Sequence, residues 1–250
     1  MTATERHDGT PGFTLGIVVA LPQEARAIMR YCSAYMQAPP GEGGVLLEIS
    51  GVGGERAAAG AQRLIAAGAN ALLSWGTAAG LQPGFGAGAL LVPEAIIARD
   101  GETLGVDKAW QQRMRQRLSP YLDVVVQPLA ESAAVLRTPA DKQDLHHATG
   151  APAADMESAA LARVARQAGV PFLVIRAIAD PVSGTIPDSV TTAIGGGEVR
   201  VAKLLGSIIM RPRQWPQLIQ LSRWFGAAQD TLLQAAKRTA PFMLANEDNG

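Results

Sequence analysis

The stretch Asp155–Asp180, DMESAALARVARQAGVPFLVIRAIAD, decides the fold class because it predicts a helix followed at once by a buried strand. Residues 155–168 are rich in alanine, and the glycine and proline that follow within three residues are the usual signal for a helix end. Phe172–Ala179 is apolar except for Arg176, and such runs belong in a sheet covered by helices on both faces. A charged side chain inside that strand predicts a buried ion pair.

The rest of the chain repeats this alternation of strands and helices, and no internal repeat or shift in composition marks a second domain. Strands are expected at residues 14–20, 45–50, 71–75, 89–98 and 122–126, and helices at residues 55–67, 108–118 and from about residue 22. Residues from about 189 to 238 are mostly helical in pattern, with a break at residues 211–213. The alternation indicates an α/β fold with helices on both faces of one sheet.

The composition is that of a globular protein rather than a disordered one. The 250 residues are enough for one large domain, and 48% of them are hydrophobic. The 22 basic residues are balanced by 22 acidic ones, which argues against nucleic-acid binding, because that needs an excess of clustered positive charge. Residues 1–12 lack the pattern of a secretion signal, and the apolar run 13–21 is too short to cross a bilayer. The expected location is therefore the cytoplasm.

Polar residues follow three of the expected strands at the point where each strand ends. Glu24 lies just past the first strand, Thr77 just past residues 71–75, and Asp180 at the end of the apolar strand. Ligands of open α/β sheets bind outside the carboxyl ends of the strands, so these residues are candidate walls of one pocket. A single carboxylate in such a place is more often a helix cap or a solvated loop residue, and the co-occurrence of all three is what favours a site.

The glycine-rich turn Gly51-Val52-Gly53-Gly54 is open to two interpretations. A dinucleotide-binding G-x-G-x-x-G motif would need glycine where Arg56 stands, so a nucleotide-cofactor interpretation fails. The turn is either a plain strand-to-helix connection or a place where backbone N–H groups face an anion or a polarised water. No Cys and His residues have the spacing of zinc ligands, and neither a metal nor a cofactor is expected.

Five motifs in fixed order carry a resemblance to a known family. They are Gly16–Glu24 (GIVVALPQE), Ser50–Gly54 (SGVGG), Trp75–Leu81 (WGTAAGL), Asp155–Ser158 (DMES) and Arg176–Asp180 (RAIAD). From about residue 13 to residue 210 the chain resembles the nucleoside phosphorylase/nucleosidase superfamily, and in particular the methylthioadenosine/S-adenosylhomocysteine nucleosidases. Each motif alone is weak, whereas five in order are specific. The resemblance implies a three-layer αβα domain with a central twisted mixed sheet, assembled as a homodimer.

Two catalytic residues follow from this resemblance. Glu24 matches the glutamate that activates the attacking water, and Asp180 matches the aspartate that protonates N7 of the departing adenine. Adenine is a poor leaving group as an anion, and proton transfer of this kind is typically worth about 10²–10⁴ in rate. Asp180 must therefore hold a proton near neutral pH, which burial at the end of an apolar strand favours. The sugar becomes oxocarbenium-like, and a second carboxylate on its opposite face directs water.

Further residues are expected to bind the substrate on the same grounds. Met156 and Glu157 match the pair at the ribose, where the glutamate binds the sugar hydroxyls. Glu157 is expected in the first turn of the following helix, where the helix dipole favours a negative charge. Thr77 stands where the family has serine, so that a hydroxyl is retained. Gly53 and Ala78 lie in the matching motifs and complete the expected substrate-binding set.

The loop after the first strand bears on the identity of the nucleophile. Phosphorylases of the superfamily hold phosphate with arginines, one in this loop and one just before the Gly-Ser/Thr pair. Here residues 21–23 contain no arginine, and Ser74 and Trp75 precede Gly76-Thr77. A phosphate dianion is poorly held without a charge-assisted clamp, so hydrolysis is favoured over phosphorolysis.

Two departures from the methylthioadenosine branch bear on the substrate. Residues 137–142 lack the aromatic side chain that stacks on adenine in that branch. Residues 211–238 extend beyond the family core and combine apolar residues near helical spacing with arginine and lysine. This pattern fits either a helix packed on the domain or its dimer partner, or an amphipathic helix at a membrane surface. The extension resembles the hopanoid-associated phosphorylase-like proteins, which implies adenosylhopane as the substrate and ribosylhopane as the product.

The expected organisation is a nucleosidase-like domain over residues 13–210, a helical extension over residues 211–240, and flexible ends at residues 1–12 and 241–250. The leading hypothesis is a cytoplasmic nucleosidase that releases adenine from a small-molecule or lipid-linked nucleoside, with peripheral contact at the inner face of the membrane. Three alternatives remain: a methylthioadenosine/S-adenosylhomocysteine nucleosidase, a phosphate-dependent phosphorylase, and a nucleoside- or lipid-binding protein without activity.

Overall fold

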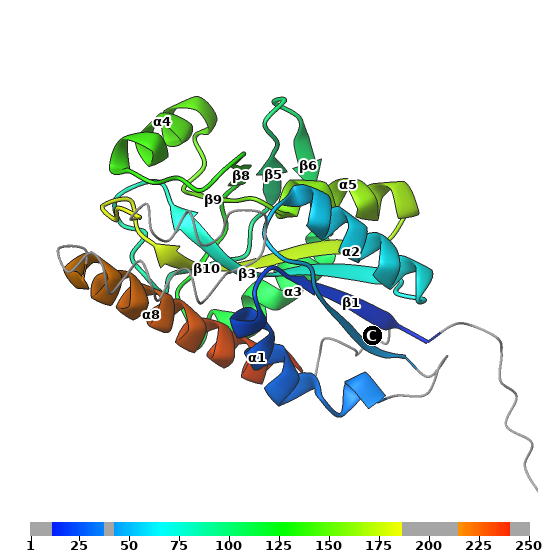
Figure 1. The fold of residues 1–250 in the computed structure, drawn as a ribbon. Helices are drawn as coiled ribbons and strands as arrows, with labels where there is room; N and C mark the ends of the chain where they lie inside the picture. The colour runs from blue at the N-terminus through cyan, green and yellow to red at the C-terminus, as the bar shows by residue number, and fades with distance from the viewer. Residues whose placement is uncertain (1–11, 38–42, 187–214, 241–250) are drawn as a thin grey trace, which may run out of the picture.

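The computed structural model describes residues 12–37, 43–186 and 215–240, which form helix, sheet and helix layers (Figure 1). The strands are β1 (Thr14–Val19), β2 (Gly44–Ile49), β3 (Ala71–Gly80), β4 (Leu90–Leu91), β5 (Ala95–Ile97), β6 (Thr103–Gly105), β7 (Val124–Val125), β8 (Leu129–Glu131), β9 (Ala153–Asp155) and β10 (Phe172–Asp180). The helices are α1 (Pro22–Cys32), the 3-10 helix η1 (Tyr35–Gln37), α2 (Gly54–Ala66), α3 (Lys108–Leu118), α4 (Pro139–Thr149), α5 (Ser158–Ala168) and α8 (Trp215–Thr239).

The long strands β3 and β10 form the centre of the sheet and run parallel to each other. β1 pairs in parallel with the first half of β3 and also with β2, whereas β9 pairs antiparallel with the last two residues of β3. The remaining path of the sheet runs in the order β6-β5-β8-β9-β3-β10-β4-β7. Parallel and antiparallel pairs occur together, so the mixed sheet expected from the sequence is confirmed.

Helices cover both faces of the sheet, which confirms the three-layer prediction. On one face, Ile28 of α1, Trp110 of α3 and Leu232 of α8 are buried in a single apolar cluster. On the other face, Leu64 of α2 and Leu161 of α5 belong to a second cluster. All nine residues of β10 are buried between these layers, as its apolar sequence predicts.

Helix α8 belongs to the core of the domain over its C-terminal half. Ala228, Leu232, Ala235 and Ala236 are buried, and α8 lies against α1 and β10 (Figure 1). The structure thus shows the packed form of the C-terminal extension. Ile219, in the N-terminal half, is 54% exposed, and membrane contact there remains a prediction. Among the described helices, none is long and apolar enough to cross a membrane.

Several element boundaries differ from the sequence predictions. β3 continues to Gly80, so Thr77 lies within the strand and not past its end. Asp155 ends β9 and α5 begins only at Ser158, because Asp155 pairs with β8; Glu157 is therefore the N-cap residue and not part of the first turn. The expected strand over residues 89–98 is split into β4 and β5.

A proline between β4 and β5 explains that split, because proline cannot donate to a strand ladder. The strands β6, β8 and β9 go unpredicted because runs of three residues are too short to show a period of two. The helical pattern expected over residues 189–214 lies outside the described residues, and the proposed domain boundaries stay predictions.

Candidate active site

The polar residues expected at the strand ends line one cavity of about 180 Å³. Its walls include Glu24 from α1, Thr77 and Ala78 from β3, Met156 and Glu157 from the bend between β9 and α5, and Asp180 from the end of β10. Gly53 does not line this cavity but borders a neighbouring one. The structure therefore brings together every predicted site residue except Gly53, which contributes indirectly through its backbone.

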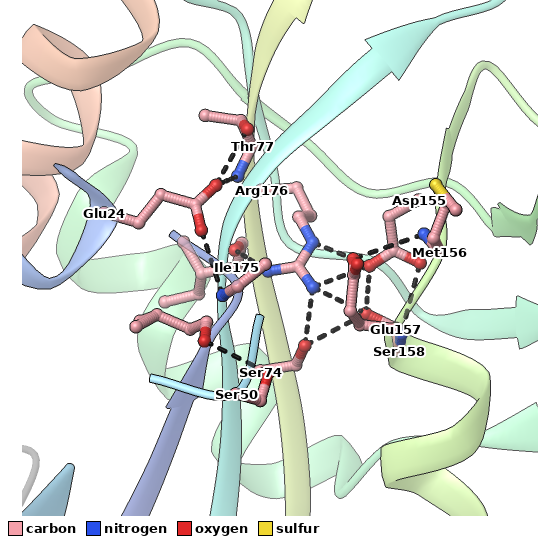
Figure 2. Close-up of polar contacts among 12 residues, drawn as sticks. Glu24, Ser50, Ser74, Thr77, Asp155, Met156, Glu157, Ser158, Ile175 and Arg176 are labelled. Atoms are coloured by element: carbon pink, nitrogen blue, oxygen red, sulfur yellow. Dashed lines mark hydrogen bonds and ion pairs between the residues drawn. The ribbon is translucent and has the colours of Figure 1, made fainter. Parts of the chain in front are cut away.

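Glu24 is buried and its carboxylate accepts four hydrogen bonds. Oε2 accepts from the N–H groups of Ala20 and Leu21 at 3.1 and 3.0 Å, next to the start of α1. Oε1 accepts from both the backbone N–H and the hydroxyl of Thr77, each at 2.8 Å (Figure 2). A carboxylate has about four acceptor positions, so a water reaches Glu24 only by replacing a protein donor. The rotatable hydroxyl of Thr77 is the donor that can turn away.

The carboxylates of Glu24 and Asp180 each lie very close to a glycine. A Cβ on Gly76 would lie 2.8 Å from Oε1 of Glu24, so β3 can pass the carboxylate only as glycine. A Cβ on Gly184 would collide with Oδ1 of Asp180 and would lie 2.8 Å from the ring of Trp224 in α8. The C-terminal helix α8 therefore packs close to the segment that follows Asp180.

The glycine-rich turn before α2 binds the carboxylate of Glu157. Oε1 of Glu157 accepts from the N–H of Gly53 at 2.8 Å, and Oε2 accepts from the N–H of Met156 at 3.3 Å. Gly53 has φ +106° and ψ 151°, a conformation that is open essentially only to glycine. Of the two interpretations of the turn, the structure supports the one in which an N–H group faces an anion, and that anion is a side chain of the protein itself.

The pKa of Glu157 is raised to about 7, chiefly by burial and next by the charge of the neighbouring Asp155. The charge of Arg176 and the N–H of Gly53 act in the opposite direction. A carboxylate in this setting changes its protonation state close to neutral pH. Donors supplied by a bound ligand, such as sugar hydroxyls, would favour its ionised form.

The predicted buried ion pair of Arg176 is confirmed. Its Nη2 lies 2.6 Å from Oδ2 of Asp155, with both side chains almost fully buried. The guanidinium also donates to the hydroxyls of Ser74 and Ser158, at 2.7 and 3.2 Å (Figure 2). This network ties β3, β9, β10 and the start of α5 together, and so fixes the bend that carries Glu157.

Asp180 has a charged partner that the sequence analysis missed. The side chain of Lys142, in the first turn of α4, is fully buried, and its Nζ lies 2.7 Å from Oδ2 of Asp180. Burial raises the pKa of Asp180, and the charge of Lys142 opposes that shift. The capping box of Thr138 and Asp141 around Pro139 signals the start of α4 in the sequence, but it does not mark Lys142 as a partner of Asp180.

Comparisons with known proteins identify the family and the fold. A family model described as the Phosphorylase superfamily matches residues 14–210. One similar structure is a 5′-methylthioadenosine/S-adenosylhomocysteine nucleosidase from Neisseria meningitidis in complex with methylthio-immucillin-A, at 15% identity and a TM-score of 0.69 over 92% of this chain and 99% of that chain. Another is futalosine hydrolase from Helicobacter pylori, at 17% identity and a TM-score of 0.66 over 92% of this chain and 95% of that chain.

A variant of the Helicobacter pylori methylthioadenosine nucleosidase, with 5′-methylthioadenosine in its active site, is similar at 15% identity and a TM-score of 0.65, covering 90% of this chain and 98% of that chain. At these identities the likeness of the structures shows the fold alone. No curated protein matches the sequence. Because the family model matches well over half of the chain, the protein belongs to the phosphorylase superfamily.

Proposed function

We propose that this protein is a nucleosidase that hydrolyses the N-glycosidic bond of a purine nucleoside and releases adenine. One observation carries the proposal: Glu24, Glu157 and Asp180 reach a single small cavity from three separate elements. Cleavage of a glycosidic bond with an oxocarbenium-like transition state uses a carboxylic acid on the leaving group and a carboxylate for the water. Two of the three carboxylates serve these roles, and the third can bind the sugar hydroxyls.

The proposed roles follow from the environment of each carboxylate. Asp180 is buried beside the cavity and its raised pKa favours the protonated form that an acid must have. Its proton passes to N7 of the base while the bond between the sugar and the base breaks, and the bonding electrons go to the base. Glu157 accepts the ribose hydroxyls and fixes the sugar. Glu24 orients a water that replaces the hydroxyl of Thr77 and accepts its proton.

The lining of the cavity supports water over phosphate as the nucleophile. Within the described part of the chain, no arginine, lysine or histidine lines the cavity. Phosphate is usually held by charge-assisted hydrogen bonds from such side chains. Hydrolysis needs no cationic side chain to hold its nucleophile, whereas phosphorolysis would need a cation from outside the described walls.

For the substrate we propose an adenosine with a large apolar substituent, in particular adenosylhopane, which would give ribosylhopane. The wall of the cavity is apolar at Ala134, Val135 and Leu136, and these residues also line a second cavity of about 610 Å³ toward α4. The inner surface of this second cavity includes Ile97 and Leu145. Arg99, Glu131 and Asp141 also line the second cavity, but the wall that it shares with the site is apolar, which suits a hydrocarbon chain better than a charged one.

Hydrolysis of methylthioadenosine or S-adenosylhomocysteine is the second candidate. It is favoured by the likeness of the fold to nucleosidases that bind methylthioadenosine and methylthio-immucillin-A. The apolar wall would hold a methylthio group as well as a longer chain. The wall alone therefore does not distinguish the two substrates, and their relative rates must.

A direct comparison of substrates tests the proposal. Purified protein is incubated with adenosylhopane in detergent micelles and, separately, with methylthioadenosine in the same micelles, and adenine is quantified by chromatography. The proposal expects adenine from both or from adenosylhopane alone, with the higher kcat/KM for adenosylhopane, and a fall in the rate of release of about 10²–10⁴-fold in Asp180→Asn. Preference for methylthioadenosine would move the assignment to the second candidate. Tight binding of either compound without adenine release would indicate a binding protein.

A further inference from the structure

The buried lysine of α4 has a complete set of oxygen partners beside the active site. Lys142 Nζ donates to the carbonyl oxygens of Pro181 and Gly184, at 2.8 and 2.9 Å, and lies 2.7 Å from Oδ2 of Asp180. An ammonium group has three N–H donors, and here two of them form hydrogen bonds to carbonyls while the charge is paired with Asp180. A fully buried lysine is costly unless it is paired in this way, and its nearest partner is the residue proposed as the acid.

The lysine makes the two oxygens of Asp180 different. Oδ2 forms the ion pair with the ammonium group of Lys142, whereas Oδ1 lies beside Gly184. Neither oxygen has a hydrogen bond of good geometry among the described residues, so the ion pair is what distinguishes them and leaves Oδ1 without a partner. A buried carboxyl oxygen without a partner is unfavourable as half of a carboxylate, because its charge goes unbalanced. It is suitable as the oxygen that holds a proton until a base arrives to accept it.

We propose that Lys142 is the positioning residue of the acid, so that the group that protonates the leaving base is a Lys142–Asp180 pair and not a lone aspartate. This inference rests on the proposed function. Lys142 holds Oδ2, leaves Oδ1 to carry the proton, and balances the negative charge that appears on Asp180 when that proton is given away.

The proton balance of the step is simple. The Oδ1–H bond of Asp180 breaks and an N–H bond forms on the base, while the glycosidic bond breaks and its electron pair goes to the base. Asp180 becomes a carboxylate next to the ammonium group of Lys142, so the step ends in a buried ion pair. Asp180 takes up a proton from solvent after the products leave, and Lys142 keeps its own protons throughout.

The electrostatic surroundings are consistent with this division of labour. Burial raises the pKa of Asp180 and lowers the pKa of Lys142, and each group opposes the shift of the other. Asp141, on the same helix, is a further charge that acts on Lys142 and favours its protonated form. Burial thus keeps Asp180 protonated before the reaction. Lys142 limits the rise in its pKa, so that Asp180 can still give up the proton.

A purely structural role for Lys142 is the competing explanation, because its bonds to Pro181 and Gly184 also tie down the turn after β10. Two substitutions separate the explanations. Lys142→Met keeps the approximate volume and removes charge and donors, whereas Lys142→Gln removes the charge and keeps an amide donor for the carbonyls. Lys108→Met makes the same chemical change at an exposed lysine and serves as the matched control.

The experiment measures kcat, KM and the pH profile of adenine release for these variants, with thermal melting to verify folding. We expect both Lys142 variants to lose roughly 10–100-fold in kcat, part of the gain typical of general acid catalysis, with little change in KM. The rate should fall at alkaline pH, where Asp180 loses its proton. In the Lys142 variants we expect this alkaline limb to move to higher pH, because the charge of Lys142 no longer lowers the pKa that burial raises. Lys108→Met keeps wild-type values.

The Asp180→Asn background supplies the decisive arm. Asp180→Asn is expected to keep a residual rate of base release about 10²–10⁴-fold below that of the wild type. If Lys142 acts through Asp180, then adding Lys142→Met to Asp180→Asn does not lower this residual rate further. A folded Lys142→Gln protein with wild-type kcat and an unmoved alkaline limb overturns the inference and leaves the proposed function intact, as does an additive loss in the double variant. Wild-type protein that releases no base, or Asp180→Asn protein with a wild-type kcat, overturns the proposed function itself.

Discussion

The backbone N–H of Gly53 donates to Oε1 of Glu157 at 2.8 Å, across 104 positions of the sequence. This bond joins the turn before α2 to the bend before α5, and it places the carboxylate at the cavity wall. It also shows why glycine-rich turns are ambiguous in a sequence. The N–H group of this turn faces an anion, but a carboxylate of the protein takes the place that a nucleotide phosphate has in other folds.

Gly53→Ala should disturb this bond through the backbone alone. Nothing lies within 4 Å of the added Cβ, but φ is +106°, so the variant either strains the turn or moves the N–H away from Glu157. We expect a loss of stability of about 1–3 kcal/mol and a rise in KM larger than the fall in kcat. Gly105→Ala, at another open glycine without a positive φ, is the control. Equal effects of the two substitutions in denaturant melts and kinetics would argue against a special role for the turn.

The pH profile of kcat/KM should have an acidic limb set by Glu157. Its pKa is about 7 in the absence of ligand, and only the ionised carboxylate accepts two sugar hydroxyls. We therefore expect kcat/KM for adenine release to fall as the pH drops below about 7. Glu157→Gln should have a low kcat/KM that no longer depends on pH in this range. An acidic limb that survives unchanged in Glu157→Gln would assign the limb to another group.

Glu157 should also make the protein less stable as the pH rises. Its pKa is about 7 in the folded protein, whereas the ordinary value for a glutamate is 4.5. The folded protein therefore binds this proton more tightly than the unfolded chain does. The resulting stabilisation is complete below about pH 4.5 and is lost as the pH rises through 7. A loss on the order of 1–3 kcal/mol is expected between pH 5 and pH 8. In urea titrations across this range, Glu157→Gln should lose less stability than the wild type; parallel curves would contradict the shift.

The ion pair between Arg176 and Asp155 should be essential for stability and not only for the site. Removal of one partner leaves a buried charge without compensation, which costs about 3–5 kcal/mol. Arg176→Met should therefore lower the free energy of unfolding by that amount. Arg63→Met, which breaks the exposed pair with Glu48, should cost about 1 kcal/mol or less. Similar denaturation midpoints for the two variants would show that the buried network contributes little.

Much of this architecture was predictable because the relevant signals are local. β10 is an unbroken apolar strand and α5 ends at a glycine, so the central layer and one covering helix are legible in residues 155–180. Thr77 and Asp180 could be placed at one end of the sheet because parallel strands expose their carboxyl ends together. The places of Thr77 and Asp180 therefore follow from the strand pattern, whereas Glu157 was found through the resemblance of its motif.

The contacts that tune the site depend on long-range packing and could not be read in the same way. Lys142 reaches Asp180 only because α4 folds back over the turn after β10, and nothing in the local pattern of α4 indicates a partner 38 positions further along the chain. The N-cap position of Glu157 was missed for a similar reason, since β9 exists only through its pairing with β8 and β3. Short strands of this kind carry no periodicity of their own.

The most direct test of the central claim is the fate of the sugar when the reaction runs in ¹⁸O-labelled water, with and without phosphate. The proposed chemistry predicts adenine together with a free sugar that carries ¹⁸O at C1′, at a rate that phosphate does not change. A sugar 1-phosphate as the main product, or adenine release that requires phosphate, would contradict it.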